Sequence, residues 1–370
     1  MTKRVLIVPK GYLGDLVLTS PVIEALKASS PDIHITMLVP PQFVSFVKSD
    51  PLVDDVIVFD RRTIGKGWKG LKMFAREVAA RRFDRAYSFH RSPRTSLLLW
   101  LAKVPERIGY SDAIASFLYT RRVERSARCH EVIRNLELIS EDLSAELQGE
   151  LEGLRRPGPN AVSERFTLRV PRIEHDEVSE SIRTVVDDPK PYMVLSPGSA
   201  WETKRWSTAG FREVAAGLIA RGMRVVIVGA PDDSAACQEV AAGLGPDVVN
   251  TCGRTSLLEL IHIIRCSQGV VCNDSLALHL ASATGRPTVV VYCATSPLFG
   301  FGPWKNRAIV VEKTDLFCKP CRRHGSKSCP TGTNACMEGV SGATVLQALL
   351  DLRSEDIRLR GGSSFKVISS

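Results

Sequence analysis

The segment CNDSLALHLASATGRPTVVVYCATSP, residues 272–297, combines polar residues with a predicted helix start in a way that suits phosphate binding. Asn273, Asp274 and Ser275 precede the helical pattern, and His279 lies four residues after Ser275 on the same helical face. A helix N-terminus binds anions through its unpaired backbone N–H groups and its partial positive charge. Asp and Ser are also good N-caps, so capping alone is the competing interpretation.

A second loop, KGYLGDLVLTSP at residues 10–21, places a carboxylate at another predicted helix start. Gly11 and Gly14 allow close approach of the backbone. The spacing is neither the G-x-G-x-x-G dinucleotide fingerprint nor a P-loop. Asp15 is stabilised as an anion near a helix N-terminus and is a candidate base for a sugar hydroxyl, with capping again the alternative.

Loops that follow strands in the second half of the chain supply further candidates. Lys204 lies in SPGSAWETKRW, a loop with serine and glycine, although most lysines are simply solvated. His279 is either a ligand-side residue or a satisfied core histidine. The other candidates for contact with a nucleotide are Ser196, Gly198, Ser199, Gly229, Asp232, Gly253 and Thr255, of which Thr255 is also a candidate helix cap.

Basic side chains gather after the fourth predicted strand. They are His90, Arg91, Arg94 and Arg107. Arginine binds phosphate or carboxylate through two parallel hydrogen bonds, so this group suits an anionic sugar acceptor. A solvated basic rim is the alternative interpretation.

The ten cysteines divide into a scattered set and a cluster. Six are scattered, and they are interpreted as small buried apolar residues of a reducing compartment: Cys129, Cys237, Cys252, Cys266, Cys272 and Cys293. The other four form the pattern Cys318-x2-Cys321-x7-Cys329-x6-Cys336 in a polar loop rich in Pro and Gly. A structural zinc site, free thiols and disulfides are all open for this cluster, and a catalytic metal is not expected.

Short apolar runs alternate with helical patterns, which predicts parallel sheets covered by helices on both faces. The predicted strands are 4–8, 34–39, 56–59, 85–89, 192–196, 224–228, 248–250, 269–272 and 288–292. Besides the helix after Ser275, the predicted helices are 16–27, 41–48, 71–82, 93–102, 113–119, 130–147, 174–186, 208–221, 234–244, 256–265 and 345–352.

Two domains are predicted from the length of the chain and from the restart of this rhythm. The N-terminal domain covers residues 1–170 and includes the turn-rich stretch RRPGPNAVS at 155–163. A linker covers 171–190, and the C-terminal domain covers 191–352 with a Cys-rich loop at 314–338. Residues 353–370 are expected to be a flexible tail. A ligand cleft is expected where the carboxyl ends of the two sets of strands face each other.

Composition and charge indicate a soluble protein with an anionic partner. The chain is 44% hydrophobic, and it holds no apolar run of the ~18–20 residues that cross a bilayer, so a cytoplasmic location is expected. The net charge of +9 favours a nucleotide, a phosphorylated lipid or an anionic membrane leaflet. Nucleic acid is disfavoured because the sequence has no basic arm, zinc-finger spacing or aromatic RNA-binding signature.

The Gly14-Asp15 loop, the run Lys204-Arg205-Trp206 and the segment Asn273-Asp274-Ser275…His279 together resemble the ADP-heptose:lipopolysaccharide heptosyltransferases of glycosyltransferase family 9. The resemblance covers about residues 3–350 and is more specific in combination than in any single motif. It implies the GT-B fold, in which two Rossmann-like, doubly wound parallel-sheet α/β domains face a cleft.

The resemblance also implies residue roles. Asp15 matches the general base, with Gly14 beside the acceptor, and Lys204 matches the lysine that contacts the donor diphosphate. The remaining donor-side matches are Asn273, Asp274, Ser275, His279, Gly253 and Thr255. Leu276 departs from the family pattern, which has glycine there. Because leucine is costly in a left-handed conformation, we expect altered backbone approach to the donor sugar at this point.

The activity implied by the resemblance is inverting transfer of a heptose or related sugar from an ADP-activated donor to the lipopolysaccharide inner core. No cofactor is needed for catalysis in this scheme, and the acceptor is a lipid-linked core oligosaccharide at the inner membrane. A nucleotide-sugar epimerase of GT-B type and a non-catalytic sugar-nucleotide-binding protein are the alternatives. The missing glycine fingerprint disfavours a nicotinamide oxidoreductase.

Overall fold

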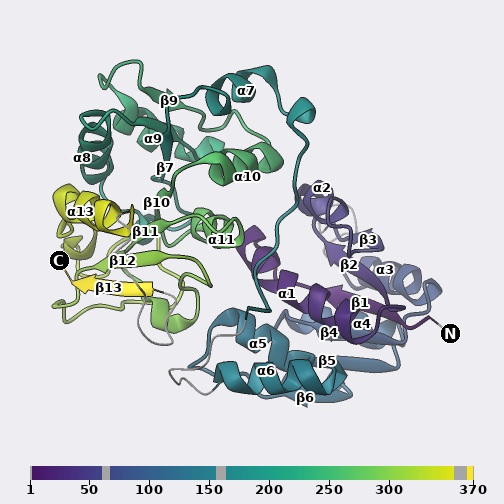
Figure 1. Cartoon of the computed structure of the whole chain (residues 1–370). Helices are drawn as coiled ribbons and strands as arrows, with labels where there is room; N and C mark the ends of the chain where they lie inside the picture. Colours follow the sequence, from purple (N-terminus) through teal and green to yellow (C-terminus); the bar gives the residue numbers. More distant parts are fainter. Residues whose placement is uncertain (1, 61–66, 156–163, 354–364, 370) are drawn as a thin grey trace. The chain divides into compact units, whose positions relative to one another are not determined.

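The computed structural model describes residues 2–60, 67–155, 164–353 and 365–369 of the 370. It divides the chain into two compact units, Met1–Phe166 and Thr167–Ser370. Each unit has its own parallel sheet (Figure 1). The predicted turn at 156–163 and the tail residues 354–364 lie outside the described part. No helix within the described residues is long and apolar enough to cross a membrane.

Unit 1 is built on six parallel strands in the order β3-β2-β1-β4-β5-β6. The strands are β1 (Arg4–Val8), β2 (His34–Val39), β3 (Asp55–Val58), β4 (Arg85–Ser88), β5 (Glu106–Tyr110) and β6 (Arg121–Val123). The helices are α1 (Leu13–Ser29), α2 (Val44–Lys48), α3 (Trp68–Ala80), α4 (Pro93–Leu101), α5 (Glu131–Leu138) and α6 (Ala145–Arg155). Leu6 and Val8 of β1 share a buried core with residues of α3 and α4, while α1 packs against α5.

Unit 2 holds seven parallel strands in the order β13-β12-β11-β10-β7-β8-β9. The strands are β7 (Tyr192–Ser196), β8 (Arg224–Ile227), β9 (Val248–Asn250), β10 (Val270–Asn273), β11 (Thr288–Tyr292), β12 (Ala308–Glu312) and β13 (Phe365–Ser369). The helices are α7 (Glu180–Val186), α8 (Thr208–Ile219), α9 (Ser234–Ala241), α10 (Leu257–Cys266), α11 (Leu276–Ala283), α12 (Ala335–Glu338) and α13 (Gly342–Arg353). The core on one face combines the central strands with α8, α9 and α13.

Both sheets are doubly wound, so each has a switch point where the strand order reverses. In unit 1 the switch lies between β1 and β4, and in unit 2 it lies between β7 and β10. Ligands of open α/β sheets bind just beyond the carboxyl ends of the strands at such points. Asp15 lies in the first turn of the helix after β1, and Ser199 and Asp274 lie in the loops after β7 and β10. The fold thus brings these predicted site residues to the expected edge of each sheet.

Three predicted helices are wrong in extent. Within 113–119 the chain forms only a 3₁₀ turn, Ser116–Leu118, in the connection between β5 and β6. The next residue, Tyr119, is buried, and its hydroxyl group donates to Ser88 Oγ at 2.8 Å. The predicted helix 130–147 is split into α5 and α6, because Leu143 is extended (φ −81°, ψ 151°) between them. Similarly, only Glu180–Val186 of the helix predicted at 174–186 is α-helical.

Four strands were not predicted: β5, β6, β12 and β13. β5 starts with charged residues, and β6 is a three-residue edge strand. β13 corrects the expectation of a flexible tail at residues 365–369, because this segment pairs in parallel with β12 (Figure 1). The predicted linker 171–190 belongs to unit 2 and contains α7.

Candidate functional site

Asp15 lies in the first turn of α1, directly after the loop that follows β1. Its side chain is 14% exposed, and its Oδ1 lies 3.6 Å from Lys10 Nζ. Among the contacts of the described residues its carboxylate meets Lys10 and accepts from no backbone N–H group, so Asp15 is not a helix cap. Burial raises the pKa of Asp15, against the pull of Lys10. A carboxylate that is buried and more basic than usual is suited to accept a proton.

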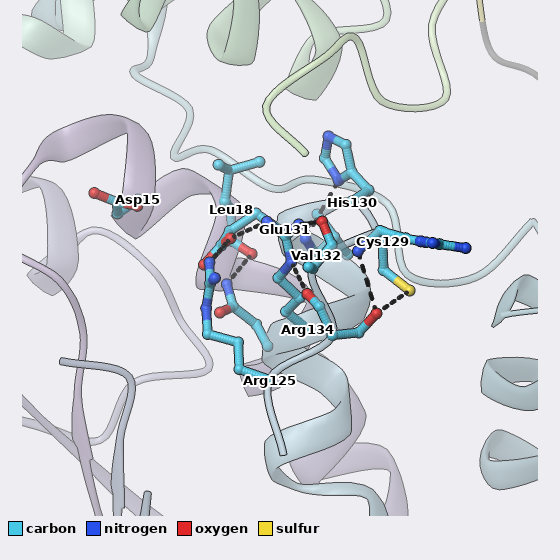
Figure 2. A network of polar contacts seen from close by, with 12 residues as sticks. Asp15, Leu18, Arg125, Cys129, His130, Glu131, Val132 and Arg134 are labelled. Carbon is cyan, nitrogen blue, oxygen red and sulfur yellow. Dashed lines mark hydrogen bonds and ion pairs between the residues drawn. The ribbon is translucent and has the colours of Figure 1, made fainter. Parts of the chain in front are cut away.

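A second carboxylate, that of Glu131 at the first position of α5, contacts the same lysine (Figure 2). Glu131 is fully buried and accepts hydrogen bonds from Lys10, from Arg125 Nη2 at 2.6 Å and from Arg134 Nη1 at 2.9 Å. These cations hold the pKa of Glu131 at about 2, although burial alone would raise it. The loop after β1 and the start of α5 therefore place two unlike carboxylates on either side of one lysine.

In unit 2, Lys204 closes the 3₁₀ turn Glu202–Lys204 and pairs with the loop after β10. Lys204 Nζ lies 2.7 Å from Asp274 Oδ2, and the two side chains are 14% and 7% exposed. Thr295 Oγ1 also donates to Asp274 Oδ2 at 2.7 Å. The carboxylate of Asp274 is thus occupied by neighbours on two other loops, which fixes the ammonium of Lys204 at the start of α11.

Two polar atoms beside this ion pair are buried and have no hydrogen-bond partner among the residues that the structure describes. They are Ser275 Oγ and His279 Nδ1, on the N-cap residue and the fourth residue of α11. Ser275 forms no side-chain cap, so the capping interpretation of this serine is not supported. Burial lowers the pKa of His279 to about 4, so its ring is neutral near pH 7. A ligand at the N-terminus of α11 would satisfy both atoms, which otherwise cost free energy.

Three other donor-side candidates, Asn273, Thr255 and Ser199, lie at the end of β10 or in loops of unit 2. Asn273 is fully buried, accepts from Trp206 N at 3.0 Å and donates to Pro197 O at 2.7 Å, so it ties three segments together. Thr255 is not the cap of α10, because Ser256 caps that helix in a capping box with Glu259. Ser199 is buried and donates weakly to Asp274 O at 3.5 Å.

The loops after β7 and β8 meet through Asp233 rather than Asp232. Asp232 is exposed, whereas Asp233 accepts from Ala230 N at 3.0 Å and from Arg205 Nη2 at 3.2 Å. A Cβ atom at Gly198 would lie 2.2 Å from the Asp233 carboxyl group, so only glycine fits there. The remaining predicted residues in these loops are Ser196, which ends β7, Gly229, which packs against Asp233, and Gly253, which has a φ of +69°.

Leu276 does not produce the expected backbone penalty. It is the first residue of α11 and is absent from the residues with positive φ. The backbone N–H groups of the first turn of α11 therefore keep ordinary helical geometry. The departure from the family pattern changes the side chain at this point and leaves the conformation of the helix start unchanged.

The basic cluster of unit 1 splits into two groups. His90, Arg91 and Arg94 follow β4, and Arg91 forms a half-exposed ion pair with Asp112 at 2.8 Å. His90 Nδ1 accepts from Ser92 N, and the Arg94 guanidinium lies 5.8 Å from the centre of the Phe59 ring. Arg107, on β5, donates to Leu118 O at 2.9 Å and to Val104 O at 2.5 Å. These bonds hold the connection to β6.

The four clustered cysteines, Cys318, Cys321, Cys329 and Cys336, are free thiols. The other three thiols all act on the pKa of Cys336, which burial raises to about 11, so the loop gathers them in one neighbourhood. Across the described ranges, however, no three His, Cys, Asp or Glu side chains form a group that could hold a metal ion. The structural zinc stays a prediction from the sequence.

Comparison with known proteins decides the family. The model of glycosyltransferase family 9 (heptosyltransferase) matches residues 71–331. The chain belongs to glycosyltransferase family 9. Lipopolysaccharide heptosyltransferase 2 of Salmonella typhimurium is 24% identical over 366 residues, which cover 95% of this chain and 99% of that protein.

Solved structures show that this family 9 glycosyltransferase has the GT-B fold. The Escherichia coli ADP-heptose lipopolysaccharide heptosyltransferase II matches with a TM-score of 0.72 at 22% identity, over 95% of this chain and 98% of that one. An E. coli heptosyltransferase with ADP matches with a TM-score of 0.68 at 20% identity, over 94% and 99% of the two chains.

Sequence reasoning missed several residues of the glycosyltransferase site. Glu131 pairs with the lysine beside Asp15 and is itself held by Arg125 and Arg134, and Thr295 supports Asp274. Lys10 stood in the Asp15 loop, but nothing assigned it a partner. Glu131 begins a helix after the basic run 121–128, a position where an acidic residue normally indicates a solvated helix start. Only the pairing of α5 with α1 reveals its burial.

Proposed function

We propose that this glycosyltransferase transfers a heptose from ADP-heptose to the lipopolysaccharide inner core, with inversion and without a catalytic metal. Its relatives are named as lipopolysaccharide heptosyltransferases, and one solved neighbour holds ADP. The observation that carries the proposal is the start of α11, where Ser275 Oγ and His279 Nδ1 are buried without partners beside Lys204. An anion with several acceptor oxygens, such as a diphosphate, suits these donors.

In the proposed donor site, the first-turn N–H groups of α11, the Ser275 hydroxyl and the neutral His279 ring donate to the diphosphate. Lys204 supplies the positive charge that offsets the charge on the departing ADP. Asp274 acts as a positioning residue: a carboxylate repels phosphate, but its ion pair and its bond from Thr295 hold Lys204 in place. A lysine and a helix start can stabilise the leaving group without a divalent cation.

In the proposed reaction, Asp15 takes the proton from an acceptor hydroxyl. The acceptor oxygen attacks the anomeric carbon of the heptose, the bond from that carbon to the diphosphate oxygen breaks, and ADP leaves with the bonding electrons. Attack opposite the leaving group inverts the configuration. The raised pKa of Asp15 favours this role, because a more basic carboxylate takes a greater share of the proton in the transition state. Arg91 and Arg94 are the proposed contacts for anionic groups of the acceptor.

Substitution of the base tests the proposal. Asp15→Asn should lower kcat for acceptor-dependent ADP release by roughly 10²–10⁴-fold and leave the ADP-heptose Kd within about twofold of the wild type. The assay uses ADP-heptose and a heptose-free lipopolysaccharide core, with EDTA present and the product configuration read by NMR. Retained turnover in Asp15→Asn removes Asp15 from the base role, and donor turnover without acceptor indicates an epimerase.

The proposed membrane contact is carried by the outer face of α3. Trp68 and Met73 are 52% and 69% exposed there, and Lys69, Lys72 and Arg76 are exposed on the same short helix. Exposed apolar side chains interleaved with cations suit the interface of an anionic leaflet, where the lipid-linked acceptor resides. This supports a peripheral association with the membrane.

A further inference from the structure

The lysine beside the proposed base is shared with a second carboxylate. Lys10 forms its close ion pair with Glu131, whereas its Nζ is 3.6 Å from Asp15 Oδ1. Glu131 begins α5 and is fully buried, and Asp15 lies in the first turn of α1. Lys10 is therefore drawn toward the carboxylate that faces away from solvent, and Asp15 receives only a partial counter-ion.

Glu131 is held rigidly by its surroundings. Arg134 is fully buried and, besides Glu131, donates to Ser126 O at 2.6 Å and to Ala127 O at 2.7 Å. The next residue, Asn135, donates to Leu18 O at 3.0 Å and so ties α5 to the helix that carries Asp15 (Figure 2). These bonds fix the start of α5 and the arginine that holds Glu131, so the carboxylate that pairs with Lys10 is positioned by the fold.

The charges around the pair make the two carboxylates chemically different. Lys10, Arg125 and Arg134 surround Glu131 and keep it ionised. The groups that act on Asp15 are Lys10, Glu131 and Arg125: the two cations lower its pKa, and Glu131 raises it together with burial. Two titratable groups whose pKa values are shifted in opposite directions are typical of a site where one group stays charged and the other exchanges a proton.

We propose that Glu131 is a positioning residue for the base: it anchors Lys10 between the two carboxylates and prevents an exclusive ion pair between Lys10 and Asp15. The inference rests on the proposed function, in which Asp15 accepts the acceptor proton. An exclusive ion pair would lower the pKa of Asp15 and leave it a weaker base, whereas loss of the lysine would raise that pKa further. The shared lysine holds the basicity of Asp15 between these two limits.

Two substitutions should shift the pKa of Asp15 in opposite directions. Glu131→Gln removes a negative neighbour and frees Lys10 to close on Asp15, and both effects lower the pKa of Asp15. The acid limb of the kcat profile then moves to lower pH, and kcat on the plateau falls by about tenfold because the base is weaker. Lys10→Met removes the cation and moves the acid limb to higher pH. The KM for ADP-heptose should stay within about twofold in both variants.

The experiment measures kcat against pH for acceptor-dependent ADP release from ADP-heptose by the full chain. The titration of Asp15 is followed in parallel by NMR of ¹³C-carboxyl-labelled aspartate, with the signal assigned by its loss in Asp15→Asn. Lys27→Met is the matched control, because Lys27 on α1 makes a similarly exposed ion pair with Asp54 at 2.7 Å. It should move neither the acid limb nor the Asp15 signal.

Opposite shifts of the acid limb and of the Asp15 titration support the positioning role. Loss of kcat in Glu131→Gln and Lys10→Met without either shift overturns the positioning role. A purely structural defect would lower kcat without changing the pKa of Asp15. If Glu131→Gln fails to fold, the direction in which Lys10→Met shifts the acid limb and the Asp15 titration decides whether the positioning role holds. If the wild type lacks acceptor-dependent ADP release and the two variants still move the Asp15 NMR titration in opposite directions, the positioning role is supported and the proposed transferase function is rejected.

Discussion

Asp274 illustrates how a single residue changes meaning once its partners are known. Its place at a helix start indicated direct contact with phosphate, but a buried carboxylate beside a diphosphate would be repelled. In the structure Asp274 holds Lys204 and is itself held by Thr295. Positive charge is therefore presented by a lysine that cannot swing away, which reduces the reorganisation needed when charge develops on the leaving group.

His279 should make the stability of the protein depend on pH. Its pKa is about 4 when folded and near 6.5 when unfolded, because burial disfavours the charged ring. The unfolded chain thus binds more protons between these values, so this stabilisation is full above pH 6.5 and is lost as pH falls toward 4. From pH 7.5 to pH 5.0 the wild type should lose about 2 kcal/mol of unfolding free energy through this residue.

Urea denaturation at the two pH values measures the effect, with His279→Gln as the comparison. The variant should lose about 2 kcal/mol less than the wild type over the same interval, because its side chain does not titrate. Equal losses in both proteins would show that the buried ring is not kept neutral by the fold.

At the residue scale, sequence reasoning found the groups whose motifs are local and missed those whose role depends on distant partners. Asp15 and Lys204 stand in recognisable loops. Glu131 is separated from Lys10 by 121 positions in the sequence, and nothing local predicts their contact. Asp232, the predicted nucleotide contact, is exposed, whereas the neighbouring Asp233 turns inward to Arg205, and nothing local in the sequence distinguishes the two.

At the element scale, the Cys-rich loop supports the turn that carries Lys204. Thr203 Oγ1, on that turn, accepts from Ser326 N at 2.8 Å, and Thr203 N donates to Ser326 O at 3.2 Å. Ala294, after β11, donates its N–H to Thr203 O at 3.1 Å and accepts from Cys321 N at 3.0 Å. The loop thus links the 3₁₀ turn to the central sheet, whatever its thiols bind.

Thr203→Val should loosen this support. The substitution keeps the shape of the buried side chain but leaves the Ser326 N–H group without its acceptor, which costs about 1–3 kcal/mol of unfolding free energy. Because Lys204 follows directly, the ADP Kd should also rise by about three- to tenfold. Calorimetric titration with ADP and urea denaturation measure the two effects. Thr184→Val, which removes an exposed bond to Glu180 O on α7, is the control and should leave ADP affinity unchanged.

Five strands, each built around a run of apolar residues, were predicted with their observed bounds. The predicted bounds 4–8, 34–39, 192–196, 248–250 and 288–292 are those of β1, β2, β7, β9 and β11. β5 escaped prediction because it begins with two charged residues, and β6 because it is a short edge strand that carries charged residues. β13 escaped because its pairing with β12 depends on a segment more than 50 residues away. Local periodicity reports burial, and edge strands are only partly buried.

At the scale of the whole molecule, the two units share one kind of topology and differ in net charge. Each unit has a doubly wound parallel sheet, and each carries its reactive loops at its switch point. Residues 1–166 contain 26 basic and 20 acidic side chains, whereas residues 167–370 contain 23 and 20. The unit that carries Asp15 is therefore the more positive, as expected for the side that meets a lipid-linked, anionic acceptor.

This asymmetry predicts salt-sensitive binding to anionic membranes through α3. The full chain should co-sediment with vesicles that contain phosphatidylglycerol and not with pure phosphatidylcholine, and binding should fall steeply between 0.1 and 0.5 M salt because exposed charges are screened. The double substitution Trp68→Ser with Met73→Ser should reduce the bound fraction at least about threefold, because it removes the apolar side chains that enter the interface. Leu298→Ser, at an apolar residue of unit 2 that is 82% exposed, is the matched control. Equal binding by the α3 variant and the control would place the membrane contact elsewhere on the molecule.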